Sequence, residues 1–395
     1  MSEAYIVEAV RTATGKKKGR LSNVHPVDLG AVVVDELIDR TGIATDAVDD
    51  VIFGVVNQIG AQASNLGRGV SMSSKLDLSV PGTSVDRQCG SSLQAIQFGA
   101  QAVMSGTQDV IISGGVEAMS TVEIGSNVRD GLANGRGTPK GERLEAQYPG
   151  IQFSQFDGAE LLAEKYDIGR SELDSFALTS HERATNATQN GFFEKEVVPV
   201  NIRLEDGSID VHSIDEGIRM DASLEGLEGL NALREGGVIT AGSASQISDG
   251  AAAVLIANEE GVKQHGLKAR ARIHSLAVVG SDPVIMLEGP IPATQKVLQK
   301  AGLKIEDIDL YEVNEAFGSV PLAWAKATGA DPSKLNVNGG AQALGHPLGA
   351  TGAKLMTTLL HELERRGGRY GLLAICEGGG TANAMIIERL VSGNG

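Results

Sequence analysis

The chain has 395 residues, which is enough for two or three domains with well-filled cores. Its formal net charge of -16 argues against a general affinity for nucleic acid or an anionic membrane, because both surfaces would repel it. The N-terminus has no basic region followed by an apolar run, no stretch approaches membrane-spanning length, and Cys89 and Cys376 are the only cysteines. We therefore expect a cytoplasmic protein without a disulfide framework.

The first part of the chain alternates strand-like and helix-like segments. Residues 4–10 predict a strand, residues 28–40 have helical periodicity, and residues 48–56 form an apolar run typical of a buried parallel strand. A further strand is expected at residues 109–113, before two glycines. With 51 glycines and 4% aromatic residues, this alternation favours tightly packed α/β layers.

Cys89 lies in a short turn between a predicted strand and a predicted helix. Small and polar neighbours are followed by a largely apolar stretch from Leu93 to Met104, which is typical of a buried helix. A cysteine near a helix N-terminus is a candidate nucleophile, because the free N–H groups and the helix dipole favour a thiolate. The alternative is a buried structural thiol, which is the usual fate of a lone cysteine.

The pattern changes after Met119. Residues 120–158 are rich in Gly, Asn, Arg and Gln with weak periodicity, whereas residues 158–166 and 171–189 have helical character. Polar, loop-rich sequence continues to about Asp249. We interpret residues 119–248 as an insertion that lies on the main body.

The C-terminal part repeats the N-terminal plan. Residues 48–58 parallel residues 305–315 with a shift of 257 positions, and the same shift carries Cys89 onto His346 (346 − 89 = 257). Two such halves would direct their reactive residues into one crevice across a pseudo-twofold axis. A chance match of short apolar strings is the alternative. The predicted division is residues 1–118 with 249–268, the insertion 119–248, and residues 269–395.

Three further stretches combine residues that carry chemistry. Asn314 precedes Glu315, His346 lies in Gly345-His346-Pro347, and Cys376 is followed by Glu377 and three glycines. Each has a simpler reading: Asn314 could cap a helix that begins at Glu315, His346 could be a turn residue, and Cys376 could be a core thiol.

Together with the Cys89 turn, these stretches resemble the thiolase family over nearly the whole chain. The resemblance implies a five-layered αβαβα fold of two duplicated halves with an inserted loop domain, and a homodimer or homotetramer. It also implies cleavage of 3-ketoacyl-CoA by coenzyme A, a co-substrate, to acetyl-CoA and a shortened acyl-CoA. It implies no metal and no permanently bound cofactor.

The reaction requires a nucleophile, two sites that stabilise negative charge, and an acid for the departing carbon. Cys89 would attack while His346 draws off its proton, and Cys376 would protonate the acetyl-CoA enolate and later deprotonate coenzyme A. By resemblance, His346 and a water held by Asn314 form one oxyanion site, and the N–H groups of Cys89 and Gly378 form the other.

Two residues match family positions that contact coenzyme A. Arg219 matches a position near the adenine nucleotide, and Ser245, among small residues, matches a serine near the pantetheine arm. An exposed arginine and a plain tight turn are the respective alternatives.

Departures from the family pattern bear on the substrate. Residues 154–158 replace the usual His-Met-Gly or Met-Gly, and Glu377 stands where an apolar residue is more usual. The run from Cys376 to Asn383 resembles actinobacterial degradative thiolases, including ones that act on products of steroid ring opening. A degradative thiolase is therefore the leading hypothesis. A biosynthetic acetoacetyl-CoA thiolase, a non-catalytic acyl-CoA carrier and a ketoacyl synthase are the alternatives.

Overall fold

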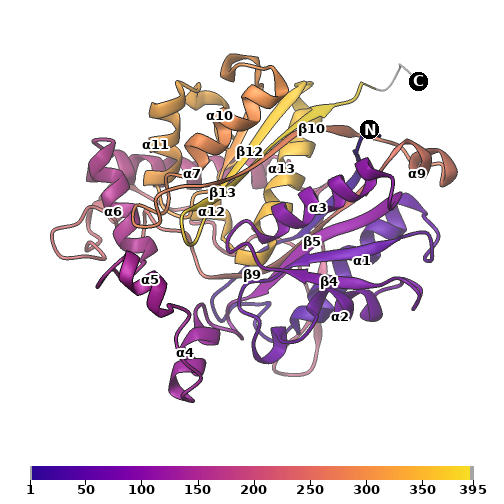
Figure 1. The fold of residues 1–395 in the computed structure, drawn as a ribbon, viewed down its shortest axis with the longest axis horizontal. Helices are drawn as coiled ribbons and strands as arrows, with labels where there is room; N and C mark the ends of the chain where they lie inside the picture. Colours follow the sequence, from indigo (N-terminus) through magenta and orange to yellow (C-terminus); the bar gives the residue numbers. More distant parts are fainter. Residues whose placement is uncertain (1, 392–395) are drawn as a thin grey trace.

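The chain folds into two similar α/β halves that lie side by side (Figure 1). The structure is a computed structural model and describes residues 2–391. The strands of the first half are β1 (Tyr5–Thr12), β3 (Asp50–Gly54), β4 (Gly82–Val85), β5 (Val110–Ala118) and β9 (Ser248–Ala257). Those of the second half are β10 (Ala271–Gly280), β11 (Leu310–Val313), β12 (Tyr370–Glu377) and β13 (Thr381–Arg389).

The two sheets are joined at one edge by an antiparallel pairing of β1 with β10. Tyr5 pairs with Arg272 and Ile6 with Ala271, so the strands follow one path, β11-β12-β13-β10-β1-β9-β5-β3-β4. Short strands extend it, because β2 (Gly15–Lys16) pairs with β9 and β6 (Val197–Val198) pairs with β1.

Helices form three layers around the two sheets. The first half is covered on its outer face by α1 (Pro26–Thr41) and α2 (Leu66–Ser73), and the second half by α10 (Pro290–Ala301) and α11 (Ser319–Thr328). Between the sheets lie α3 (Ser91–Ser105) and α13 (Thr351–Arg366), which share one buried cluster with strands of both halves. The predicted five-layered αβαβα architecture is confirmed.

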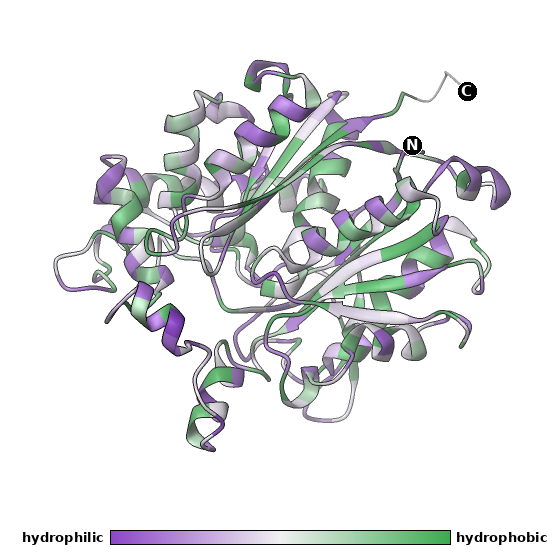
Figure 2. Cartoon of the chain, viewed as in Figure 1, coloured by the Kyte–Doolittle hydropathy of each residue, from purple (hydrophilic) through white to green (hydrophobic). Residues whose placement is uncertain are grey.

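The strands are apolar on both faces because alternate side chains pack against different helix layers. In β5, Ile111 packs into the central layer, whereas Val110 and Ile112 pack against α1 and α2. Figure 2 shows the same apolar colouring along the strands and on the helix faces that meet them. The predicted strands and helices of the first half fall within one to five residues of the observed ends.

The internal repeat is real, but its register differs from the sequence expectation. Val51 of β3 pairs with Ile112, and Tyr311 of β11 pairs with Leu372, which gives a shift of 260 on both strands (311 − 51 and 372 − 112). The helices α3 and α13 also begin 260 positions apart (351 − 91). The structural counterpart of Cys89 is therefore Gly349, and the expected match to His346 was wrong by three residues.

The segment between β5 and β9 contains short helices and a separate two-stranded sheet. Its elements are α4 (Ser126–Ala133), α5 (Glu142–Gln147), α6 (Gln155–Lys165), α7 (Arg170–Gln189), β7 (Val200–Arg203), β8 (Ile209–His212) and α8 (Leu224–Glu228). Helices α4 and α5 are mostly exposed, whereas α6 packs against the second half in one buried cluster with α11. The exact domain limits given above stay a prediction.

The other helical elements of the described residues are α9 (Glu259–Gln264), α12 (Ala341–Leu344) and the 3-10 turns Gly60–Gln62, Ile305–Asp307, Pro332–Lys334 and Leu348–Ala350. Within residues 2–391, no helix is both long enough and apolar enough to cross a bilayer.

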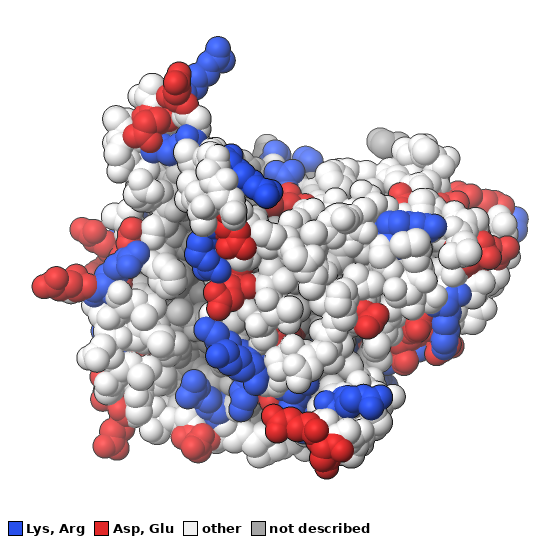
Figure 3. All heavy atoms as spheres, turned by 90° about the horizontal axis from the view of Figure 1, so that it is seen from below, with Lys and Arg blue, Asp and Glu red and all other residues white. Residues whose placement is uncertain are grey.

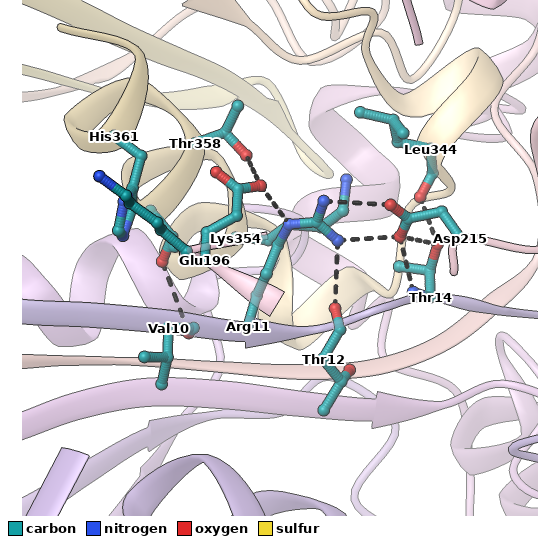
Figure 4. A network of polar contacts seen from close by, with 12 residues as sticks. Val10, Arg11, Thr12, Thr14, Glu196, Asp215, Leu344, Lys354, Thr358 and His361 are labelled. Carbon is teal, nitrogen blue, oxygen red and sulfur yellow. Dashed lines mark hydrogen bonds and ion pairs between the residues drawn. The ribbon is translucent and has the colours of Figure 1, made fainter. Parts of the chain in front are cut away.

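A buried charge network fastens the inserted segment to the first strand (Figure 4). Arg11 of β1 is fully buried and donates from Nε to Glu196 at 2.6 Å and from both terminal nitrogens to Asp215 at 2.8 and 3.0 Å. Thr14 donates to the Leu344 carbonyl at 2.5 Å, and its N–H donates to Asp215 at 2.7 Å. The network thus reaches the loop that carries His346.

Candidate active site

The two central helices meet at their N-termini. The N–H of Ala353 in α13 donates to Ser92 Oγ in α3 at 2.9 Å. Gly352 permits this contact, because a Cβ there would lie 2.2 Å from the backbone nitrogen of Leu93. Since Cys89 comes just before α3 and His346 just before α13, this contact brings their loops together.

Cys89 lies in a strained turn just before the helix. Gln88 has a φ of 49°, and the N–H groups of Gly90 and Ser91 donate to the carbonyls of Arg87 and Gln88 at 3.1 and 3.0 Å. The Cys89 side chain is 5% exposed. Helix α3 begins at Ser91, so Cys89 lies two residues before it.

Both cysteines are free thiols in an environment that opposes ionisation. Burial raises the pKa of Cys89 well above its usual range, and the neighbouring Cys376 and Glu377 raise it further. Burial, and then Glu377, raise the pKa of Cys376 to about 12. The expected thiolate is therefore not the resting form of Cys89, because desolvation outweighs the helix N-terminus.

His346 is a buried, neutral imidazole. Burial, and then the cation of Lys354, lower its pKa to about 3. Its Nδ1 lies 2.6 Å from Thr351 Oγ1, and that hydroxyl donates to the Pro347 carbonyl at 2.9 Å. Because the hydroxyl proton is used there, Nδ1 carries the hydrogen and Nε2 keeps its lone pair. His346 can therefore accept a proton at Nε2.

Asn314 follows β11 and lies beside that nitrogen. Its Nδ2 is 3.4 Å from His346 Nε2, and its own N–H donates to the Ala374 carbonyl at 3.1 Å. Its Oδ1 is buried and accepts no hydrogen bond from the described residues. Helix α11 begins at Ser319, so Asn314 does not cap a helix at Glu315.

Cys376 and Gly378 come from the hairpin between β12 and β13. Cys376 is 1% exposed, and Gly379 and Gly380 turn the chain with φ values of 79° and 72°. A Cβ on Gly378 would lie 2.9 Å from Gln88 Oε1, so the hairpin faces the Cys89 turn directly. The structure thus brings four buried residues, Cys89, His346, Asn314 and Cys376, into one region with the half-buried Gly378.

The two predicted coenzyme A contacts lie at or beside a surface cavity whose lining includes none of the five residues of that region. Arg219 is exposed and lines a cavity of about 270 Å³ together with His181, whose Nδ1 accepts the Arg219 N–H at 3.1 Å. Ser245 is half-buried between the lining residues Gly242 and Gln246, and its N–H donates to the Ala316 carbonyl at 2.9 Å. Figure 3 shows Lys and Arg side chains gathered along a hollow on one face, despite the acidic total.

Sequence reasoning missed two residues of the site. Thr351 fixes the His346 ring, and Lys354 is fully buried, with its Nζ 3.5 Å from the Gly345 carbonyl. Burial, and then the Arg11 cation, lower the pKa of Lys354 to about 8. A lysine six residues after Leu348, on a buried helix face, was the available signal.

The fold and the paired thiols define an acyltransferase of the thiolase family. Residues 4–260 match the family model described as the thiolase N-terminal domain and residues 267–389 the thiolase C-terminal domain, so the chain belongs to this family. The chain is therefore a thiolase.

Similar proteins cover the chain almost completely. A steroid 3-ketoacyl-CoA thiolase of Mycobacterium tuberculosis is 56% identical over 99% of this chain and 95% of its own length. A beta-ketoadipyl-CoA thiolase of Acinetobacter baylyi is 44% identical over 99% of this chain and 100% of its own length. The crystal structure of a Bacillus anthracis acetyl-CoA acetyltransferase has a TM-score of 0.90 at 38% identity, covering 99% of both chains.

Proposed function

We propose that this thiolase works in the degradative direction on bulky, ring-derived 3-ketoacyl-CoA substrates. The observation that carries the substrate class is the 56% identity to a steroid 3-ketoacyl-CoA thiolase, against 44% to a thiolase of a linear dicarboxylic acyl group. The variant sequence after Cys376, with Glu377 and Asn383, supports the same class.

In the proposed mechanism, Cys89 Sγ attacks the ketone carbon while its proton moves to His346 Nε2. The new Nε2–H then faces the oxyanion, so one imidazole acts first as base and then as donor. Asn314 Nδ2, beside the same nitrogen, supports this charge. The neutral resting state of both partners favours this coupled step over a preformed ion pair.

Collapse of the oxyanion breaks the bond between Cα and Cβ. The bonding electrons move to Cα as the enolate of acetyl-CoA, and the Cys376 thiol delivers the proton that Cα requires. The resulting Cys376 thiolate removes the proton of incoming coenzyme A, whose sulfur releases the acyl group from Cys89. The His346 imidazolium returns its proton to the departing Cys89 sulfur, which restores both groups. The close approach of Gly378 to the Cys89 turn supports their N–H groups as the second oxyanion site.

Coenzyme A would enter past Arg219 and Ser245. The exposed guanidinium offers positive charge for the nucleotide phosphates, and the small residues around Ser245 leave room for the pantetheine arm. Because the mechanism needs both thiols reduced, we expect the enzyme in the cytoplasm. The family resemblance favours a homodimer or homotetramer.

Steady-state thiolysis tests the substrate class. The purified enzyme should cleave a ring-bearing 3-ketoacyl-CoA with a higher kcat/KM than acetoacetyl-CoA. Activity confined to acetoacetyl-CoA would instead support the biosynthetic alternative. Condensation from malonyl thioesters would support a ketoacyl synthase.

A further inference from the structure

Glu377 is a buried carboxyl group inside the site that the reaction scheme does not use. It ends β12 directly after Cys376 and is 0% exposed. Its Oε1 occupies the space where a side chain on Gly90 would begin, since a Cβ there would lie 1.8 Å away. The carboxyl group is therefore packed against the turn that carries Cys89 and is adjacent in sequence to Cys376.

The repeat supplies an internal comparison for this group. At the shift of 260, Glu377 corresponds to Glu117 and Cys89 to Gly349 (377 − 117 and 349 − 89). Glu117 accepts the N–H groups of Val56, Asn57 and Gly349 at 3.0, 3.1 and 2.9 Å, and Gln62 Nε2 at 2.7 Å. This carboxylate is fixed by backbone donors and organises the turn opposite the catalytic one.

Glu377 has a sparser set of partners. Thr381 Oγ1 donates to its Oε2 at 2.8 Å, and the Asn383 amide, oriented to satisfy both of its ends, donates to Oε1 at 3.0 Å. The Arg87 cation lowers the pKa of Glu377. The charge of Glu377 in turn raises the pKa of Cys89 and of Cys376. Both thiols therefore experience its ionisation.

We propose that Glu377 is a positioning residue that supports the Cys89 turn and, through its own ionisation, sets the proton affinity of both reactive thiols. When the carboxyl group is neutral, Cys89 and Cys376 release their protons more readily, and when it is charged, it holds them as thiols. Burial raises the pKa of Glu377 to about 8, although Thr381 and Arg87 act to lower it. Glu377 therefore ionises in the pH range where enzymes operate. The inference deepens the proposed roles of Cys89 and Cys376.

Alkylation by iodoacetamide tests this inference without relying on turnover. The rate at Cys89 and Cys376 is measured by peptide mass spectrometry from pH 6 to pH 10 in the wild type, Glu377→Gln and the exposed control Glu260→Gln. Glutamine imitates the neutral carboxyl group, so above pH 8, where the wild-type carboxyl group is charged, both thiols should be alkylated roughly tenfold faster in Glu377→Gln only. Coincident profiles for the wild type and Glu377→Gln would overturn the inference.

Two further measurements keep the test decisive if Glu377→Gln folds poorly. Thr381→Val removes a donor to the charged form, so it should shift the thiol profile in the same direction by a smaller amount. The Tm of wild type should fall relative to Glu377→Gln from pH 5 to pH 8, because over this range the unfolded chain ionises this carboxyl group whereas the folded protein keeps it neutral. A uniform loss of Tm at every pH, with no shift of the alkylation profile, would mean a purely structural role. A failed acyl-enzyme assay would refute the proposed mechanism but leave these readouts intact.

Discussion

At the scale of single residues, protonation state rather than distance alone decides the chemistry. A lowered pKa at His346 and raised pKa values at both thiols leave the free enzyme neutral at these three groups. The imidazole is then available as a base at neutral pH without prior deprotonation. The orientation of its ring depends on one hydroxyl group, that of Thr351.

Thr351→Val should therefore lower kcat more than it changes KM. Without the hydroxyl, Nδ1 loses its partner and the imidazole can place its hydrogen on Nε2, where it cannot accept the thiol proton. We expect a loss in kcat of at least roughly 10-fold, measured by steady-state thiolysis. Thr351→Ser restores the hydroxyl and should recover most of the rate. Equal kcat in Thr351→Val and wild type would contradict this assignment.

At the scale of elements, the site depends on two helix N-termini that approach more closely than side chains would allow. Gly352 lies against the backbone of Leu93, and the Ala353 N–H meets Ser92. The loops before the two helices supply Cys89 and His346. Separating the helices should therefore separate the nucleophile from its base.

Gly352→Ala tests this contact. The added methyl group would meet backbone at 2.2 Å and force α13 away from α3. We expect a loss of roughly 1–3 kcal/mol in the free energy of unfolding, measured in urea, with a larger fractional loss of kcat. Gly131→Ala, in α4, has open space around it and should leave both quantities near wild type or slightly raise stability. Equal behaviour of the two variants would refute the contact's role.

The elements also show what sequence patterns can and cannot predict. Apolar runs located β1, β3 and β5, because burial on both faces requires such residues there. The register of the repeat came out three residues wrong, because apolar strings match almost equally well when slipped along each other. Asp49 and Asp309 are equivalent at the shift of 260, and each accepts two backbone N–H groups at the start of a strand. The sequence alone did not predict these hydrogen bonds.

At the scale of the whole molecule, the inserted segment is attached through buried charge. Arg11, Glu196 and Asp215 are far apart in the sequence and share no motif, so no local pattern could predict their pairing. The same holds for Glu377 and Gly90, which meet only because the two halves pack together. Motifs predicted the reactive residues, whereas the groups that support them depend on tertiary contacts.

Arg11→Met should destabilise the whole fold. Removal of the guanidinium leaves two buried carboxyl groups unpaired, which costs roughly 3–5 kcal/mol by comparison with other broken buried pairs. Urea unfolding measures the loss. The control Arg20→Met removes an exposed pair with Asp210 and should cost less than about 1 kcal/mol. A similar small effect for both would show that the network is not structural.

The same network predicts a direction of pH dependence. Although burial opposes its ionisation, the Arg11 guanidinium holds the pKa of Asp215 below its usual range. The stability it contributes is present above about pH 4 and is lost as pH falls through the lowered pKa. The Tm of wild type should therefore drop below pH 4 more steeply than that of Asp215→Asn. An equally steep fall of Tm below pH 4 in wild type and Asp215→Asn would contradict this assignment.

The proposed reaction requires two sulfur atoms with successive and different tasks. Intact-protein mass spectrometry after mixing with an acyl-CoA, alongside thiolysis of a 3-ketoacyl-CoA, separates these tasks in Cys89→Ala and Cys376→Ser. Cys89→Ala should show no covalent acyl group, whereas Cys376→Ser should still become acylated but cleave the carbon-carbon bond roughly 10²–10⁴-fold more slowly. An acyl adduct in Cys89→Ala, or equal loss of both partial reactions in the two variants, would contradict it.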